Sequence, residues 1–199
     1  MRLDLVVGSN GAGKTTFVRK VLLPSAPAGT AFVNADEIAR RRWPEDPEGK
    51  SYEAAQVAAA TRHALIQAGR PFIAETVFSH PSKLDLVTEA HAAGFHVAVH
   101  ALLVPEDLTV LRVERRVAAG GHSVPEEKIR QRYQRLWNLV RQAMIAADTA
   151  SVYDSSPHRR PVVVAQLASG VPIGVVRWPS WAPRELTDTW PDTWPTTGA

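Results

Sequence analysis

The chain has 199 residues, of which 45% are hydrophobic and 22% are charged, and its formal net charge is +3. These proportions are those of a globular protein with a sizeable core, and they exclude a disordered tail, a collagen-like fibre and a disulfide-stapled miniprotein. Because the chain has no cysteine, disulfides, thiolate metal sites and cysteine nucleophiles are excluded as well. The sequence shows neither a signal-like N-terminus nor an apolar run of membrane-spanning length, so we expect a cytoplasmic protein without a membrane partner.

Apolar runs and helical patterns alternate along most of the chain. Strands are predicted at 3–7, 30–34, 71–75, 96–104 and 150–153, and a terminal hairpin or two late strands at 162–167 and 171–178. Helices are predicted at 14–23, 36–42, 51–68, 82–93, 106–118 and from about 125 to 147. Strands that alternate with helices of this length predict an α/β fold, with a parallel sheet of about five strands flanked by helices.

Two of the predicted helices have an apolar face that can be read from the spacing. In the helix at 51–68, the face is expected to contain Tyr52, Ala55, Ala59 and Ile66. In the long helix after Ser123 and Pro125, which fit a cap and a first-turn residue, the expected face consists of Ile129, Tyr133, Leu136, Trp137, Val140 and Met144. His100 alternates within an apolar strand and is expected to be a core histidine with satisfied hydrogen bonds.

A phosphate-binding loop follows the first predicted strand, where the sequence matches the motif G-x-x-x-x-G-K-[ST] without a gap. Its glycines let backbone amides turn inward toward phosphate oxygens, and the helix that follows adds its positive end. Lys14 is expected to reach the β- and γ-phosphates, and Thr15 to offer its hydroxyl to Mg²⁺. The sequence therefore predicts a site for ATP and Mg²⁺, formed by Gly8, Ser9, Asn10, Gly11, Ala12, Gly13, Lys14, Thr15 and Thr16.

The loop alone does not separate motors, switches and kinases. The fourth predicted strand ends in Leu103, Val104 and Pro105, without the acidic residues typical of motor ATPases, and the third ends in a single Glu75. The ABC signature and the guanine-specifying N-K-x-D are missing. A hydrolysing motor is therefore disfavoured, although Glu75 leaves a P-loop ATPase regulator open as an alternative.

A small-molecule kinase needs a carboxylate near the γ-phosphate and cations that offset the transition-state charge. Asp36 directly follows the second predicted strand, at the sheet edge where α/β folds bind ligands, and its alternative role is to cap the helix that begins at Glu37. Glu75 ends an apolar strand at the same edge, so it should contact a ligand, a metal-bound water or an arginine. Both carboxylates fit a kinase.

Arginine supplies 18 of the 23 basic residues, and seven arginines lie between 112 and 141. Arginine-bearing helix ends around the joint at 120–122 predict a lid that folds over phosphates, with the alternative of a solvated face. Arg116 and Arg132 are the expected phosphate ligands, and Arg115 is a close rival of Arg116. The basic residues of the two helix ends are Arg112, Arg115, Arg116, Lys128, Arg130, Arg132 and Arg135.

Several of these segments together resemble the zeta-toxin family of P-loop kinases, over roughly residues 3–154. The resemblance is carried by Gly8 to Thr16, Asn34-Ala35-Asp36, Glu75-Thr76, the G-G-H-S-V-P block within 116–125, Arg132-Tyr133 and Asn138-Leu139. It implies phosphoryl transfer from ATP to the 3′-hydroxyl of the sugar in UDP-N-acetylglucosamine. It further implies that Asp36 is the base, that Glu75 and Thr76 bind the acceptor, and that Arg116 and Arg132 neutralise the transferring phosphate.

The sequence also departs from that family. Its first strand begins at residue 2 or 3, so we expect no N-terminal segment for an epsilon-type antitoxin to grip. Glu75-Thr76-Val77 stands where the toxins tend to read Glu-Gly-Thr, which leaves a kinase for another hydroxylated metabolite or an antibiotic open. A nucleic-acid partner is disfavoured by the small net charge. We expect a kinase-like domain over 1–178 and a tail rich in Trp and Pro over 179–199, either loose or pinned to the domain by its tryptophans.

Overall fold

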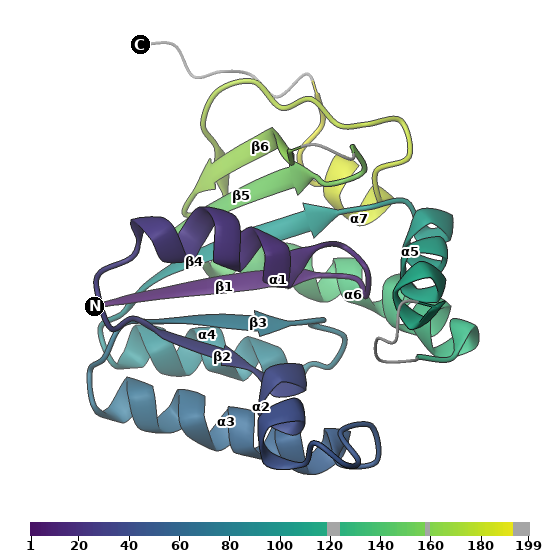
Figure 1. The fold of residues 1–199 in the computed structure, drawn as a ribbon. Helices are drawn as coiled ribbons and strands as arrows, with labels where there is room; N and C mark the ends of the chain where they lie inside the picture. The colour runs from purple at the N-terminus through teal and green to yellow at the C-terminus, as the bar shows by residue number, and fades with distance from the viewer. Residues whose placement is uncertain (119–123, 158–159, 193–199) are drawn as a thin grey trace.

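The computed structural model describes residues 1–118, 124–157 and 160–192. Within these ranges, seven strands form one sheet in the order β2-β3-β1-β4-β5-β6-β7. The first five strands in this order pair in parallel (Figure 1). β6 pairs antiparallel with β5, and β7 pairs antiparallel with β6. The strands are β1 (Arg2–Gly8), β2 (Ala31–Asn34), β3 (Phe72–Thr76), β4 (His96–Leu103), β5 (Thr149–Asp154), β6 (Val162–Ala168) and β7 (Val171–Pro172).

The predicted α/β fold is confirmed, and the terminal hairpin exists as β6 and β7, although β7 is much shorter than the predicted strand at 171–178. The helix predicted at 14–23 begins as α1 (Lys14–Phe17), widens to a π-helical segment over Val18–Leu22 and ends in a 3₁₀ turn at Leu23–Ser25. The remaining helices are α2 (Ala35–Arg42), α3 (Ser51–Gln67), α4 (Ser82–Ala92), α5 (Glu106–Ala118), α6 (Glu126–Ala146) and α7 (Arg184–Thr187).

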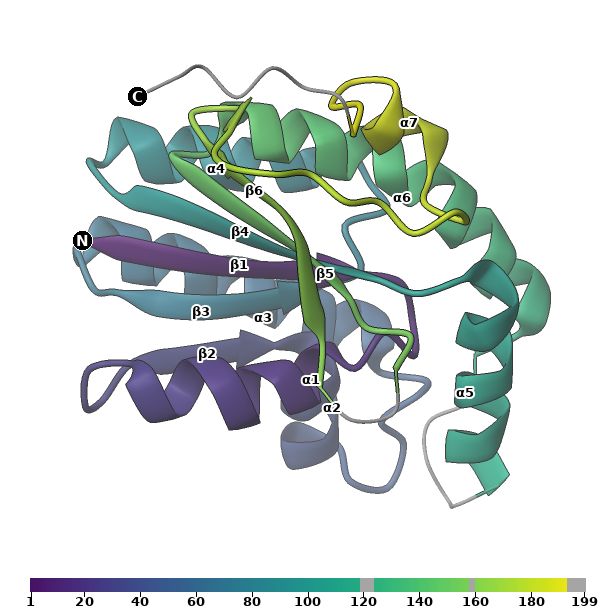
Figure 2. The same cartoon turned by 90° about the horizontal axis from the view of Figure 1, so that it is seen from above.

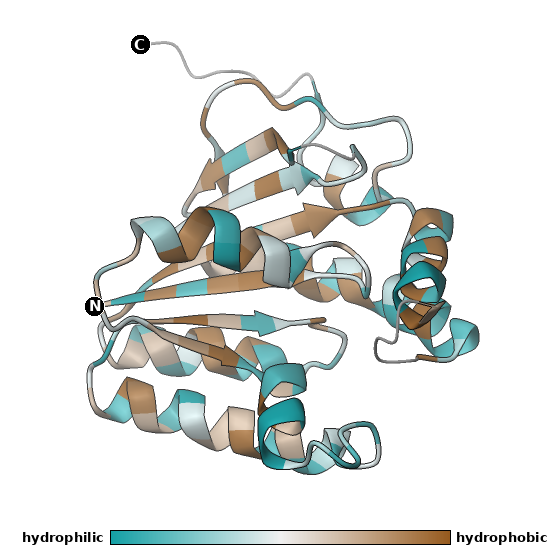
Figure 3. Cartoon of the chain, in the orientation of Figure 1, coloured by the Kyte–Doolittle hydropathy of each residue, from teal (hydrophilic) through white to brown (hydrophobic). Residues whose placement is uncertain are grey.

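Helices cover both faces of the sheet. In Figure 2, α3, α4 and α6 lie on one face and α1 lies on the other. The core is divided accordingly: Leu3 and Leu5 belong to the large apolar cluster beneath α3, α4 and α6, whereas Val6 packs with Phe17 on the α1 side. Because side chains alternate along a strand, a strand buried on both faces must be apolar at nearly every position. Figure 3 shows this as brown strands in the centre of the sheet.

The structure corrects the predicted face of α3. Its buried residues are Ala54, Ala58, Arg62 and Ile66, while Tyr52 is 72% exposed. The predicted apolar face of α6 is confirmed, since each of its six members is buried. The proposed cap Ser123 lies outside the described residues, and Pro125 precedes the first helical residue of α6 rather than occupying its first turn.

The segment after β7 is pinned to the sheet by tryptophan. Trp190 is 2% exposed and belongs to the large core cluster, and its indole N–H donates to the carbonyl oxygen of Gly170 at 2.9 Å. The indole N–H of Trp178 donates to the carbonyl oxygen of Trp190 at 2.6 Å. The described part of the tail, through Asp192, is therefore pinned to the domain and not loose. The domain boundary at 178 stays a prediction.

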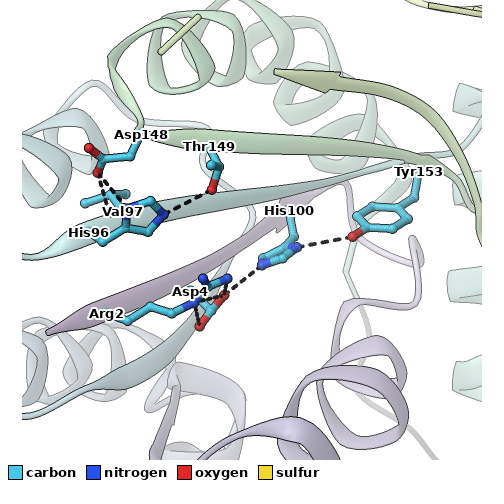
Figure 4. Close-up of polar contacts among 8 residues, drawn as sticks. All are labelled: Arg2, Asp4, His96, Val97, His100, Asp148, Thr149 and Tyr153. Carbon is cyan, nitrogen blue, oxygen red and sulfur yellow. Dashed lines mark hydrogen bonds and ion pairs between the residues drawn. The ribbon is translucent and has the colours of Figure 1, made fainter. Parts of the chain in front are cut away.

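A partly buried network of polar side chains crosses the α1 face of the sheet (Figure 4). One imidazole nitrogen of His100 lies 2.9 Å from the carboxylate of Asp4 and the other lies 3.4 Å from the hydroxyl of Tyr153. The guanidinium of Arg2 donates to the same carboxylate at 2.8 to 3.1 Å. His100 is 7% exposed, so its prediction as a satisfied core histidine is confirmed. Burial raises the pKa of Asp4, but the hydrogen bonds from His100 and Arg2 outweigh it and lower the pKa to about 2.

From this polar network we predict how the stability of the protein depends on pH. Because the pKa of Asp4 is lower in the folded state than the value near 3.9 of an unfolded chain, its contribution is complete above about pH 4 and is lost as pH falls toward 2. Asp4→Asn should therefore lower the free energy of unfolding by about 1.5–3 kcal/mol at pH 7, and by less at pH 3. Urea unfolding at both pH values measures this, with the exposed Asp85→Asn as control, and an equal loss at both pH values would contradict it.

No helix among the described ones is both long and apolar enough to cross a membrane.

Candidate active site

The loop between β1 and α1 has the backbone that phosphate binding requires. Gly8 and Gly13 adopt positive φ angles of 149° and 86°, and a Cβ atom at Gly8 would lie 2.7 Å from the carbonyl oxygen of Leu102. Only glycine fits such a position without strain. Lys14 is 7% exposed, and its ammonium group donates to the carbonyl oxygens of Gly8 and Ser9 at 3.0 and 2.8 Å. The lysine is therefore held against the loop by the loop's own backbone.

Two contacts that the sequence did not indicate brace this loop from outside. The hydroxyl of Ser155, just after β5, donates to the carbonyl oxygen of Ala12 at 2.8 Å. The guanidinium of Arg112 donates to the carbonyl oxygens of Ser155 and Ser156 at 2.9 and 3.0 Å. Because all three acceptors are backbone carbonyls, which every residue has, no sequence pattern could have signalled these contacts. Arg112 is thus partly a structural brace, although it also lines the cavity described below.

The carboxylate of Glu75 is the centre of a small polar network at the end of β3. It accepts from the hydroxyl of Thr15 at 2.9 and 3.0 Å and from the side-chain amide of Asn34 at 2.6 Å. Burial raises the pKa of Glu75, while the charge of Lys14 and these two hydrogen bonds oppose the rise. A hydroxyl beside a carboxylate is the hard oxygen donor set that Mg²⁺ prefers, so Thr15 and Glu75 fit the ion expected from the motif.

Asp36 does not cap α2. The cap is Asn34, whose side-chain oxygen accepts from the backbone N–H of Glu37 at 3.1 Å, and the helix begins at Ala35. The capping alternative for Asp36 is therefore wrong, because the helix starts directly after the strand, at Ala35, and thus earlier than the pattern indicated. Asp36 sits in the first helical turn with an exposed side chain that lines the cavity.

The predicted catalytic side chains meet around one cavity of about 1100 Å³. Its size exceeds that of a site for one drug-sized ligand, so it offers room for a nucleotide and a second substrate. Its lining comes in part from the loop after β1, from the end of β3 and from α2, α5 and α6; Figure 1 shows α2 and α5 on the side of the sheet toward which β3 and β4 run. Its lining includes Asn10, Gly11, Gly13, Lys14, Thr15, Thr16, Asp36, Glu75, Thr76, Arg116 and Arg132, whereas Gly8, Ser9 and Ala12 lie behind it.

The electrostatic environment of Lys14 ties these side chains together. Burial lowers the pKa of Lys14, the charges of Glu75 and Asp36 raise it, and those of Arg116 and Arg132 lower it. Coulomb interactions fall with distance, so all four groups lie near the ammonium group. Two carboxylates and three cations, drawn from five separate segments of the sequence, thus converge on the phosphate-binding loop.

The other basic residues of the predicted lid divide by position. Lys128 lines the cavity, whereas Arg115 and Arg135 do not. Arg130 joins the starts of α5 and α6 through ion pairs to Glu106, Asp107 and Glu126, and its hydrogen bonds to these carboxylates raise its pKa. It is a structural residue. The predicted joint at 120–122 lies outside the described residues, so the closing motion stays a prediction.

The cations that line the cavity also include residues that the sequence analysis missed. Arg62 from α3 and Lys83 from the first turn of α4 both line the cavity, and they come from other helices than the arginines of α5 and α6. Arg62 stands among alanines in a helix whose spacing predicted a different buried face.

Known proteins resemble this chain in sequence and in fold. An uncharacterized protein of Haemophilus influenzae is 27% identical over 127 residues, which are 63% of this chain and 88% of that protein. A chain of the AvrRxo1-ORF1:-ORF2 complex with ATP superposes with a TM-score of 0.68 at 18% identity, covering 86% of this chain and 60% of its own length. This chain thus spans less than two thirds of that one.

A third resemblance is to the PezAT chromosomal toxin–antitoxin system of Streptococcus pneumoniae, with a TM-score of 0.60 at 12% identity over 94% of this chain and 83% of that one. At such identities the structural matches establish the fold alone, an α/β fold with a mostly parallel sheet flanked by helices. The sequence model of the AAA domain (AAA_33) matches residues 3–139, well over half of the chain. The chain therefore belongs to the AAA domain family.

Proposed function

We propose that the protein is an ATP-dependent kinase that transfers the γ-phosphate to a sugar hydroxyl, that of UDP-N-acetylglucosamine or a related nucleotide-sugar. The observation that carries the proposal is the convergence of Asp36 and Glu75 with Lys14, Arg116 and Arg132 on one cavity. A cavity with carboxylates at one wall and cations around a phosphate-binding loop has the parts that phosphoryl transfer needs.

In this proposal Asp36 accepts the proton of the acceptor hydroxyl, while the oxygen of that hydroxyl bonds to the γ-phosphorus. The bond from that phosphorus to the bridging oxygen breaks, and ADP leaves with the electron pair. Lys14, Arg116 and Arg132 offset the charge on the transferring group. Glu75 and Thr76 position the acceptor. Thr15 and Glu75 would hold Mg²⁺, which would neutralise part of the charge of the phosphates.

The test is ADP release by the purified protein with ATP and Mg²⁺, with and without UDP-N-acetylglucosamine. We expect release to depend on the acceptor, and mass spectrometry to find the acceptor heavier by one phosphate. Unchanged ADP release in the absence of any acceptor would contradict the kinase.

The contact between Glu75 and Thr15 favours a second candidate, a P-loop ATPase. In that function the carboxylate beside the proposed Mg²⁺ ligand would orient a water molecule instead of an acceptor. Acceptor-independent turnover that is lost in Glu75→Gln would support it. If the protein is a kinase that acts on another metabolite or an antibiotic, a panel of hydroxylated acceptors will yield a phosphorylated product.

A further inference from the structure

One wall of the cavity carries positive charge that phosphate transfer does not explain. Arg62 lies on α3 and Lys83 in the first turn of α4, whereas the cations around the phosphate-binding loop come from α1, α5 and α6. The proposed reaction uses neither residue.

Arg62 is mostly buried, although none of its nitrogen atoms is among the fully buried, unpartnered atoms of the described residues. The residue is 7% exposed, and its side chain forms neither a hydrogen bond nor an ion pair with the described part of the chain. Burying an arginine without an acceptor is costly, so proteins almost always pair it. Burial lowers the pKa of Arg62, and no acidic residue among those described counters this. The guanidinium instead lines the cavity, where a ligand can reach it.

Lys83 reinforces the same charge. Like Arg62, it lines the cavity; burial lowers its pKa, and the charge of Arg62 lowers it further. Lys83 also stands at the positive end of α4, which has no side-chain cap and where a basic residue is disfavoured. Two cations, one of them in the first turn of α4, therefore line the same cavity.

The loop that leads into α4 adds a further irregularity. Phe78 is fully buried, lines the cavity and has a φ of 61°, which is rare for a bulky residue. Strained residues and violated local preferences gather at binding sites, because selection there acts on the ligand and not on stability. Each of these three features lowers stability, and a bound anion would relieve two of them.

We propose that Arg62 and Lys83 bind a phosphate group of the acceptor, so that the substrate class is a phosphorylated compound with a free hydroxyl. This inference rests on the proposed function, because it assigns the acceptor half of the same cavity. A phosphate carries up to two negative charges and so matches two cations, whereas a carboxylate leaves one of them uncompensated. The planar guanidinium can donate to two phosphate oxygens at once. Neutral sugars and cationic antibiotics would leave both residues unpaired.

The test measures binding of inorganic phosphate by calorimetry while a non-hydrolysable ATP analogue with Mg²⁺ saturates the nucleotide site. We expect one phosphate per chain, with affinity reduced about 10- to 100-fold in Arg62→Met and in Lys83→Met, as for the loss of a charge-assisted hydrogen bond. Arg70→Met, which changes an exposed arginine outside the cavity, should leave the affinity unchanged. Acetate at the same concentration should not compete.

Thermal unfolding of the variants separates binding from folding. Methionine removes a buried charge and keeps most of the side-chain volume, so Arg62→Met should have a Tm equal to or above that of the parent protein. Absent phosphate binding, binding that is unchanged in both variants, or equal competition by acetate would overturn the inference. If phosphate binds as expected but no acceptor is phosphorylated, the proposed function alone fails; if a neutral acceptor is phosphorylated without phosphate binding, this inference alone fails.

Discussion

Lys14→Ala is expected to remove phosphoryl transfer, lowering kcat by about 10²–10³-fold or more. Lys14 is buried, and its ammonium group donates to two of the loop's own carbonyl oxygens, those of Gly8 and Ser9. In the reaction it would move from these carbonyls to the phosphate oxygens, where it offsets the charge that develops between the β- and γ-phosphates. Single-turnover transfer from radiolabelled ATP measures the loss.

Two further variants test whether the loss is due to the charge of Lys14. Lys20→Ala changes an exposed lysine of the next helical segment that does not line the cavity, and should leave the rate unchanged. Lys14→Met retains the apolar stem of the side chain, so it tests the charge without leaving a void. A Lys14→Met protein that folds and transfers phosphate at the parent rate would contradict the assignment.

The fold could be predicted because its determinants are local. Strands buried on both faces must be apolar, and the glycines and proline between them mark the turns, so β1, β3, β4 and β5 were found within a few residues. β7 was overestimated because the apolar residues Ile173 and Val175 look like strand residues, yet both side chains are more than half exposed beyond the sheet.

The site could be predicted where a residue is tied to a strand end. Lys14 and Asp36 follow predicted strands and Glu75 ends one, and parallel strands bring their carboxyl ends to one edge. Arg62 could not be found in this way. It lies in the middle of an Ala-rich helix, and the alanines fit several helical faces equally well, so the spacing did not reveal which face is buried. Only the packing of α3 against the sheet shows that its buried face includes a charge.

Asp36→Asn is expected to retain ATP binding and to lower transfer about 10²–10⁴-fold, the range associated with loss of a general base. The carboxylate lies in the first turn of α2 and is not needed as its cap, because Asn34 fills that role, so the substitution should leave the fold intact. Removing a negative charge from a cavity that receives the phosphates of ATP should, if anything, tighten nucleotide binding. Titration with a fluorescent ATP analogue and rapid-quench transfer assays measure the two effects separately.

The matched control is Asp85→Asn, which also removes an exposed carboxylate from the first turn of a helix and therefore reproduces the loss of helix-dipole stabilisation. It does not line the cavity, so transfer should proceed at the parent rate. The same pair distinguishes the two candidate functions. A kinase that relies on Asp36 loses acceptor-dependent ADP release in Asp36→Asn, whereas an ATPase that relies on Glu75 keeps its acceptor-independent turnover. Normal transfer by Asp36→Asn would leave the cavity with a nucleotide site but without the base that the kinase requires.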